Sequence, residues 1–449
     1  MSKLFERLLK KRKISTSFLN PKYEGLTDPY ELPDMEKAVS RIKDALKNHE
    51  KILIYGDYDV DGVTSSTLME EALTLSGANP KNIGIMLPDR FADGYGMSPK
   101  LVKRAEKDKI NLVITVDCGS RNHEIIDELN ALKIDTIVTD HHETDEKMPE
   151  ALAIINPHRK DKPVEKLQNL AGVGVAFKVA EALEKAGMIK SGQEKWLLDL
   201  VVLGTISDNM LLTSENHILG FYGLKVLAKT RRPGLIELMH RAGVKKLNSE
   251  SIGFQIGPRL NAAGRLETAE LSLDLLRSRS ESEAAALSEK LETLNKKRKT
   301  EQISATKEII ERSEKLDPVI IETGDWHEGV LGIVAGRLVE EFKKPAFVLT
   351  RTTDGVLKGS GRSFGDFNLA EALTRVKDII IGGGGHALAA GVRVEQKNLY
   401  AFRERINEYY KSLNLKDQEK YLKQAPDLDI EDLSECSLEF LEELKSLEP

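Results

Sequence analysis

Three aspartates at alternate positions, Asp57, Asp59 and Asp61, follow an apolar run in "KILIYGDYDVDGVTSS". In an extended chain alternate side chains point to the same face, so these three carboxylates would lie close together and repel one another. A cation between them removes that repulsion. The spacing therefore indicates a site for positive ions.

Three further apolar runs end in acids or imidazoles. "INLVITVDCGS" ends in Asp117, "IDTIVTDHHE" in Asp140, His141 and His142, and "VVLGTISDN" in Asp208. Four or five carboxylates with one or two imidazoles suit hard or borderline divalent cations, Mn²⁺ in particular, better than zinc held by thiolates. Two such ions about 3.5 to 4 Å apart clamp the attacking and leaving oxygens of a displacement at phosphorus. The set predicts a phosphoesterase with two Mn²⁺ or Mg²⁺ ions.

Each of these residues also has a simpler interpretation. A lone aspartate after a strand is more often a helix N-cap than a metal ligand. Adjacent histidines are often surface residues, and Asp208 with Asn209 suits a turn. Three acids at one strand end and a "DHH" at another are hard to explain as independent caps, which favours the metal site. Cys118 has no pairing base or second cysteine in view, and we interpret it as structural.

The elements that must position these residues are short β-branched runs alternating with helical segments. After "KILIY" the chain places Leu68, Ala72 and Leu75 at helical spacing. This alternation predicts an α/β fold with a parallel sheet built from βαβ units. In such sheets ligands bind beyond the carboxyl ends of the strands, which is where the acids fall.

Length and patterning predict more than one domain, because 449 residues exceed one ordinary core. The charged stretch 278–316 has no glycine or proline and indicates a long connecting helix. A second α/β pattern follows it and closes with "IIIGGGGHALAAGVRV". We expect an N-terminal segment, a catalytic domain, a connecting helix, a smaller substrate-binding α/β domain and a C-terminal segment, at 1–45, 46–275, 276–316, 317–412 and 413–449.

Composition narrows the class of protein. Hydrophobic residues make up 40% and charged residues 31%, as in soluble globular proteins. No apolar run reaches the roughly 20 residues of a membrane helix, and the N-terminus lacks a secretory signal. Two cysteines cannot form a disulfide framework, which favours the cytoplasm. A net charge of −6 argues against a binder of bulk nucleic acid but allows a local basic groove.

Several motifs together resemble one family. "GDYDVDG", "VDCGS", "TDHHE" and "GTISDNM" look like the four motifs of the DHH phosphoesterase superfamily. "GPRLNAAGRL", "GDWHEGVLGIVAGRLVE" and "GGGGHALAAG" resemble the RecJ branch, from about Phe18 to the C-terminus. The resemblance implies a DHH domain joined by a long helix to a DHHA1-type domain. It also implies a 5′ to 3′ exonuclease that degrades single-stranded DNA to 5′-mononucleotides in DNA repair and recombination.

The resemblance implies that the metal ligands are Asp57, Asp59, Asp61, Asp117, His141 and Asp208. Asp59 and Asp61 would bind separate ions, with Asp57 as an additional ligand, while Asp117 and Asp208 would be shared. In the wider superfamily the first motif often begins with a histidine ligand. Tyr55 stands at that position here, so the first metal would depend more on aspartates.

Two residues of the "DHH" motif would act beside the metals rather than on them. The resemblance places His142 against the scissile phosphate, where it could stabilise charge or donate a proton. Asp140 would orient an imidazole from behind. Together with Asp117 they form the predicted catalytic set.

The resemblance also implies a group that binds the DNA backbone or its 5′ end: Arg259, Asn261, Arg265, Arg362, Gly384, Gly385 and His386. Arginine holds phosphate bidentately, and glycine amides can cradle an oxyanion. The alternative for "GPRLNAAGR" is a loop with ordinary surface arginines. Trp326 and His327 either stack on bases or, for the tryptophan, anchor a turn by packing.

Relatives of this kind usually continue past "LEELKSLEP" into an OB-type domain, so we expect the last segment to lead to a domain that this chain lacks. The alternatives are a DHH phosphodiesterase on short oligonucleotides or cyclic dinucleotides, and an inactive DNA-binding scaffold. The retained acids and histidines argue against the scaffold. Partners that follow from the resemblance are single-stranded DNA, a helicase and a single-strand binding protein, with no membrane.

Overall fold

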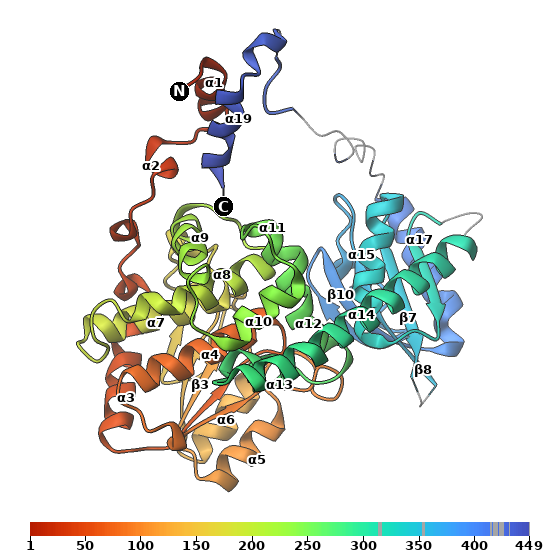
Figure 1. Ribbon diagram of the computed structural model, residues 1–449. Coiled ribbons are helices and arrows are strands. Elements are labelled where there is room, and N and C mark those ends of the chain that lie inside the picture. Colours follow the sequence, from red (N-terminus) through yellow and green to blue (C-terminus); the bar gives the residue numbers. More distant parts are fainter. Residues whose placement is uncertain are drawn as a thin grey trace. The chain divides into compact units, whose positions relative to one another are not determined.

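The computed structural model describes residues 1–312, 317–352, 355–413, 415, 421, 426–430 and 432–448. The chain forms two compact units. The first contains Met1–Thr293 and Asp427–Pro449, and the second contains Leu294–Pro426. Figure 1 shows the elements of both units. No helix within the described ranges is long and apolar enough to cross a membrane.

The first unit is built on a five-stranded parallel sheet with the strand order β2-β1-β3-β4-β5. Its strands are β1 (Ile52–Tyr55), β2 (Ile83–Met86), β3 (Leu112–Val116), β4 (Asp135–Thr139) and β5 (Ala153–Ile155). The predicted α/β class and parallel sheet are confirmed. Strands buried on both faces lack polar alternation, and β1 and β3 are apolar nearly throughout for this reason.

Helices cover both faces of this sheet (Figure 1). They are α3 (Met35–Lys47), α4 (Val60–Leu75), α5 (Pro99–Asp108), α6 (His123–Ala131) and α7 (Gly172–Lys185), while α8 (Leu198–Ser207) packs on α4 and α7. On one face Leu53 and Val113 pack with residues of α5 and α6. On the other, α4 lies against β1 and β3 and beneath α7 and α8. The buried hydroxyls of Thr64, Ser66 and Thr67 donate to carbonyls one turn back, Ser66 to Gly62 at 2.7 Å, whereas Ser65 Oγ finds no partner among the described residues.

Further helices complete the first unit. They are α1 (Lys3–Arg12), α2 (Thr16–Leu19), α9 (Ser214–Leu227), α10 (Pro233–Ala242), α11 (Ser249–Ser251), α12 (Gly257–Leu266), α13 (Glu270–Arg277) and α19 (Leu438–Leu444). The two ends of the chain share a small core in which Leu4 and Leu8 of α1 pack with Phe440 of α19 (Figure 1). The Ser2 amide donates to Glu443 Oε1 at 2.8 Å beside this core.

The predicted connecting helix is α14 (Glu281–Arg312). Its 32 residues span about 48 Å at 1.5 Å per residue, and the division between the two units falls inside it. The predicted final turn, 313–316, lies outside the described residues.

The second unit holds a mixed sheet with the order β6-β7-β8-β10-β9, in which only β6 and β7 are parallel. Its elements are β6 (Ile320–Gly324), β7 (Ala346–Arg351), β8 (Val356–Arg362), β9 (Ile380–Gly385), β10 (Ala389–Glu395), α15 (Leu331–Phe342), α16 (Leu369–Thr374) and α17 (Leu399–Ser412). Phe347 and Phe402 meet edge to face at 5.6 Å in its core. The predicted second, smaller α/β domain is confirmed.

A buried ion cluster fixes the segment before α3 to the first unit. Lys178 of α7 is fully buried, with Nζ 2.9 Å from the Thr27 carbonyl oxygen and 2.7 Å from Glu181 Oε2, and it pairs with Glu215 of α9. Glu215 Oε2 in turn accepts the Thr27 amide at 3.1 Å. One cation therefore compensates the buried Glu215 and the partly buried Glu181.

We expect Lys178→Met to lower the free energy of unfolding by about 3 to 5 kcal/mol, because it leaves the buried Glu215 and the partly buried Glu181 without a counter-charge. Lys185→Met is the matched control on the same helix, since Lys185 pairs with Asp28 at the surface and its loss costs about 1 kcal/mol or less. Urea denaturation followed by circular dichroism measures both. Equal losses in the two variants would contradict the role of the cluster.

Candidate metal centre

The carboxyl ends of β1, β3 and β4 meet at one edge of the parallel sheet, and the chemically active residues follow these strands directly. Asp57 and Asp59 follow β1, and Asp117 follows β3. The "DHH" residues Asp140, His141 and His142 follow β4. Asp208 joins them from the C-terminal end of α8.

The structure brings the six predicted metal ligands together. His141 Nε2 lies 3.2 Å from Asp117 Oδ1, 3.7 Å from Asp208 Oδ2 and 3.8 Å from Asp61 Oδ2. Three overlapping sets each offer donor atoms within 4.8 Å of one another: Asp57, Asp59 and Asp117; Asp61, His141 and Asp208; and Asp117, His141 and His142. The two sets that share no residue are the natural places for two separate ions.

Two of the acids are also helix caps. Asp59 Oδ1 accepts the amides of Asp61 at 2.9 Å and Gly62 at 3.1 Å, so it is the N-cap of α4. Asp61 accepts the amides of Gly172 at 2.6 Å and Val173 at 2.9 Å, which begin α7. The simpler interpretation as caps is therefore correct for these residues, and the same bonds hold their carboxylates in place within the donor sets.

Two glycines that the sequence analysis did not single out make room for the carboxylates. A Cβ on Gly172 would lie 2.6 Å from Asp117 Oδ1. A Cβ on Gly204 of α8 would lie 2.7 Å from Asp61 Oδ1 and 2.5 Å from Thr64 Oγ1. The glycines in "AGVGV" and "LGTISD" could have indicated close packing at these positions. The sequence does not show which side chain lies against each glycine.

Asp117 has a backbone that few residue types adopt. Its φ is 62°, in the left-handed region that asparagine, aspartate and glycine tolerate best. The Asp117 amide donates to the Thr139 carbonyl at 2.9 Å, which fixes this conformation at the strand end. The turn directs the side chain into the acid cluster, toward His141.

Asp140 is buried and forms hydrogen bonds to both histidines of the motif. Its Oδ1 accepts the His141 amide at 2.8 Å and lies 2.8 Å from His142 Nδ1, and its Oδ2 accepts the Ser120 amide at 3.0 Å. Burial raises the pKa of Asp140, but the hydrogen bond and charge of His142 outweigh it and hold that pKa well below its usual range. Asp140 thus remains an anion that fixes the His142 ring.

Burial and mutual repulsion disturb the protonation of the acids. Burial, helped by Asp59, raises the pKa of Asp57 well above its ordinary range, and burial with Asp61 does the same for Asp117. Burial and a neighbouring aspartate raise the pKa of Asp61 to about 7 and that of Asp208 to about 8. The raised pKa values show that these carboxylates lack a nearby positive charge. Such a site is suited to cations.

The pKa values of the two histidines are shifted in opposite directions. Burial, together with the charge of His142, lowers the pKa of His141 to about 3, so this ring is neutral and can offer a lone pair to a metal. For His142 the effect of burial is outweighed by the hydrogen bond and charge of Asp140, which raise its pKa to about 9. His142 is therefore a cation at neutral pH.

The residues present fit Mn²⁺ or Mg²⁺. Asp57 Oδ1 and Asp117 Oδ1 are buried, and neither accepts a hydrogen bond from the residues that the structure describes. Carboxylate oxygens with one imidazole are the donors that these ions prefer. Cys118 is buried in the sheet core with its Sγ 3.9 Å from the Tyr55 carbonyl oxygen, so no thiolate joins the set.

Tyr55, the position for which the motif resemblance implied a histidine in the wider superfamily, points away from the acids. Its hydroxyl donates to the Gly96 carbonyl at 2.9 Å, and its ring packs in the core beside Val113. Among the described residues, the donor set that follows β1 consists of Asp57, Asp59 and Asp117.

The loop after β2 contributes two residues that the sequence analysis missed. Tyr95 Oη lies 2.9 Å from His142 Nδ1, and the Arg90 guanidinium lies 4.8 Å from the centre of the Tyr58 ring. Their signal was "DRFADGYG", a glycine-containing loop after a strand. It escaped notice because β2 is short and only partly buried.

The predicted nucleic-acid residues of the first unit lie on α12, so the alternative of a surface loop is wrong. Arg259 is 9% exposed, donates to the Gln255 carbonyl at 2.7 Å and pairs with Glu292 at 2.6 Å. Asn261 Oδ1 accepts the Val60 amide at 3.2 Å. Arg265 is half-buried in the last turn. Arg259 and Asn261 thus tie α12 to α14 and to the start of α4.

The remaining predicted nucleic-acid residues lie in the second unit. Arg362 of β8 donates to the Gly361 carbonyl at 2.8 Å. Gly384 and Gly385 end β9, and the His386 amide donates to the Ala389 carbonyl at 2.8 Å. Gly385 has a φ of 145°, and a Cβ there would lie 2.3 Å from the Ala389 carbonyl oxygen. This hairpin therefore requires glycine at its tip.

Trp326 has the contacts of a packing anchor. Its Nε1 donates to Glu308 Oε2 at 2.8 Å, and a Cβ on Gly324 would strike its ring at 2.5 Å. His327 Nδ1 accepts the Gly329 amide at 3.1 Å.

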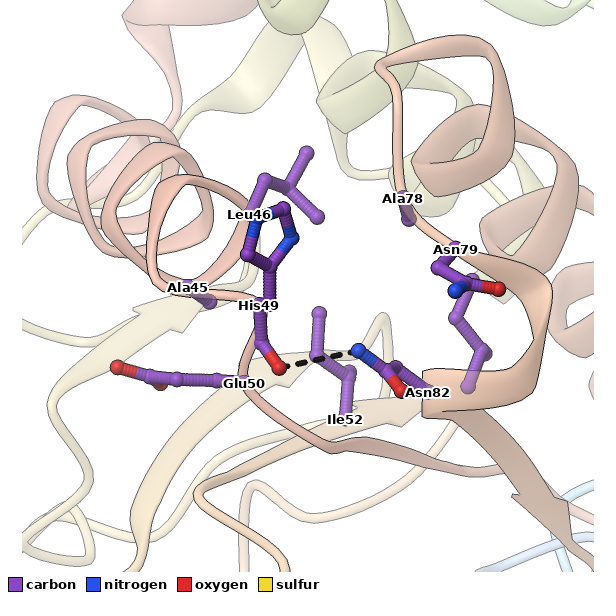
Figure 2. Close-up of a pocket in the computed structure, with 9 residues that line it drawn as sticks. Ala45, Leu46, His49, Glu50, Ile52, Ala78, Asn79 and Asn82 are labelled. Atoms are coloured by element: carbon purple, nitrogen blue, oxygen red, sulfur yellow. Dashed lines mark hydrogen bonds between the residues drawn. The ribbon is translucent and has the colours of Figure 1, made fainter.

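A hollow at the opposite edge of the sheet is not a substrate site. It lies where β1 and β2 begin, beside Ile52, and Asn82 bridges it by donating to the His49 carbonyl at 3.0 Å (Figure 2). Its volume of about 10 Å³ suits one water molecule at most.

The fold is of the DHH type. The family model for the DHH family, N-terminal domain, matches residues 51–205, and that for the DHHA1 domain matches residues 316–412. Among curated relatives, the single-stranded-DNA-specific exonuclease RecJ of Bacillus subtilis (strain 168) is 39% identical over 417 residues, which are 90% of this chain and 52% of the relative. That of Escherichia coli (strain K12) is 36% identical, over 90% of this chain and 74% of the relative.

Solved structures agree. An exonuclease RecJ bound to manganese matches with a TM-score of 0.75 and 30% identity over 89% of this chain and 98% of that one. RecJ of Thermus thermophilus in complex with Mn²⁺ matches with a TM-score of 0.82 and 28% identity, over 99% of this chain and 63% of that one. The chain belongs to the RecJ family, and it spans about half the length of the Bacillus relative.

We expect Gly172→Ala or Gly204→Ala to weaken Mn²⁺ binding roughly tenfold or more, because the new Cβ displaces Asp117 or Asp61 from the donor set. Gly253→Ala is the control in the same unit, where a Cβ would meet only Ile206 at 3.9 Å. Isothermal titration calorimetry measures the affinity, and circular dichroism checks the fold. Wild-type Mn²⁺ affinity in both folded variants would show that these glycines do not shape the centre.

Proposed function

We propose that the chain is a metal-dependent exonuclease that degrades single-stranded DNA from the 5′ end and releases 5′-mononucleotides in repair and recombination. The observation that carries the proposal is the pair of donor sets, Asp57 with Asp59 and Asp117, and Asp61 with His141 and Asp208. The names of the relatives, single-stranded-DNA-specific exonucleases, support the substrate class. The polarity rests on the motif resemblance.

The six ligands would hold two ions of Mn²⁺ or Mg²⁺. Bound there, the ions would supply Lewis-acid chemistry, polarising the phosphate and activating water for in-line attack. Asp117 belongs to two of the donor sets, which favours it as the shared ligand. Asp61 and Asp59 are held by helix-terminal amides, so their carboxylates need little reorganisation when an ion binds.

His142 would act on the substrate rather than on the ions. Since Asp140 holds Nδ1 at 2.8 Å, the other ring nitrogen, Nε2, is the one available to donate to a phosphate oxygen. Asp140 would keep this orientation and the positive charge through turnover. This division of work explains why a buried anion stands behind the second histidine.

The predicted nucleic-acid contacts remain part of this proposal. Arg265, Arg362, Gly384, Gly385 and His386 would bind the DNA backbone or its 5′ end. Arg259 and Asn261 would support that role from within α12 through their protein contacts. We also keep 46–275 as the catalytic domain and 317–412 as the substrate-binding domain.

The cellular setting follows from the family. We propose a cytoplasmic enzyme that receives single strands from a helicase and meets a single-strand binding protein. The complete donor set favours this function over an inactive scaffold.

We expect Asp117→Asn to reduce exonuclease activity by at least a thousandfold. Asparagine keeps the size of the side chain and tolerates the φ of 62°, so the loss would report the carboxylate charge rather than the backbone. The assay follows a single strand labelled near its 3′ end, with a 5′-hydroxyl or a 5′-phosphate, in Mn²⁺ or in chelator.

Asp127→Asn on the exposed face of α6 is the matched control and should retain full activity. Shortening from the 5′ end into mononucleotides supports the polarity, and shortening from the 3′ end refutes it. Near wild-type turnover by Asp117→Asn would refute the proposed role of the centre.

A further inference from the structure

A second hollow of about 490 Å³ opens on the first unit and is lined by three aromatic and three basic side chains. These residues, which we call the aromatic–basic surface, are Tyr23, Lys195, Trp196, Tyr222, Lys225 and Lys229. They come from the segment before α3, from the short turn just before α8, and from the second half of α9 and the residues that follow it. Glu24 is the one acid among the lining residues that the structure describes. The volume is in the range of ligand sites.

The aromatic–basic surface is separate from the metal centre. Trp196 stands two residues before α8 begins, and Asp208 follows directly after that helix ends. The ten residues of α8 place about 15 Å between the two. The mechanism proposed above uses none of the residues of this surface.

The three aromatic rings differ in how far other side chains of the protein already contact them. Tyr23 and Tyr222 pack edge to face at 5.5 Å, and the Tyr222 hydroxyl donates to the Pro21 carbonyl at 3.1 Å, so they form a fixed floor. Trp196 is 43% exposed. The Arg231 guanidinium lies 4.4 Å from the centre of its ring. An exposed indole beside a guanidinium offers a platform on which a planar base can stack.

The lysines of this surface stand outside the ion pairs of the described residues, although the charge of Lys195 acts on the neighbouring Glu194. Within the described ranges, Lys195, Lys225 and Lys229 form no ion pair, while many other basic side chains of the chain do. Lys195 lies 4.2 Å from the Tyr23 ring centre, and Lys225 lies 3.7 Å from that of Phe221. In a chain with a net charge of −6, a group of three lysines outside ion pairs is a local basic feature complementary to a polyanion, even with Glu24 and Glu194 nearby.

We propose that the aromatic–basic surface binds a single-stranded nucleic acid, with a base stacked on Trp196 and phosphates held by Lys225 and Lys229. Aromatic platforms interleaved with lysines are how proteins hold single strands without reading their sequence. The choice of ligand rests on the proposed function, because a single strand is the substrate there. The surface would grip the strand away from the place of cleavage and so retain it between cuts.

The test uses the full chain in chelator, which removes the ions that the proposed cleavage requires. Trp326→Phe leaves Trp196 as the only tryptophan of the two in the chain. We expect an oligothymidylate to quench its fluorescence on stacking. In the same background Lys225→Ala with Lys229→Ala should weaken binding roughly tenfold and flatten the slope of log K against log salt by about 1.4.

Lys43→Ala with Lys47→Ala is the matched control, because these lysines are also exposed, four residues apart and in the first unit. Absent quenching, or equal affinity and salt slope in the two double variants, would overturn the inference. Quenching by polyglutamate but not by the oligonucleotide would also overturn it, in favour of an acidic protein partner. Quenching in a chain that does not degrade DNA would refute the proposed function but not this surface.

Discussion

Electrostatic repulsion among buried carboxylates is the constraint on which the rest of the first unit depends. Asp57, Asp61 and Asp117 are almost fully buried at one sheet edge, where water cannot screen them. Without a counter-charge their burial raises each pKa, which is a cost to the folded state. A divalent cation converts that cost into binding free energy. The fold is therefore arranged to hold acids where an ion can join them.

The first unit meets this constraint with backbone amides that bind the carboxylates and with glycines that leave room for them. The first amides of α4 and α7 hold Asp59 and Asp61, and the glycines at 172 and 204 leave the space in which the carboxylates lie. Asp140 keeps its own charge by a different route, through His142 and backbone amides. The acids proposed to bind ions and the acid proposed to orient a histidine thus differ in their hydrogen-bond partners.

Much of this could be predicted because strand ends are local features. The runs that became β1, β3 and β4 are apolar and end in the acids, so their convergence followed from the parallel sheet. The strands β2 and β5 were not singled out, since β2 is only partly buried and β5 has three residues. Contacts between residues far apart in the sequence could not be predicted. Examples are Gly172 with Asp61, 111 positions apart, and Arg259 with Glu292.

The most direct test of the central claim is anomalous diffraction from crystals of the chain grown with Mn²⁺. We expect two anomalous peaks at the carboxyl edge of the parallel sheet, one against Asp57 and Asp59, one against Asp61 and Asp208, with Asp117 between them. Manganese bound elsewhere, with this edge empty at saturating Mn²⁺, would contradict the proposed metal centre. The buried carboxylates would then have no cation to offset their repulsion.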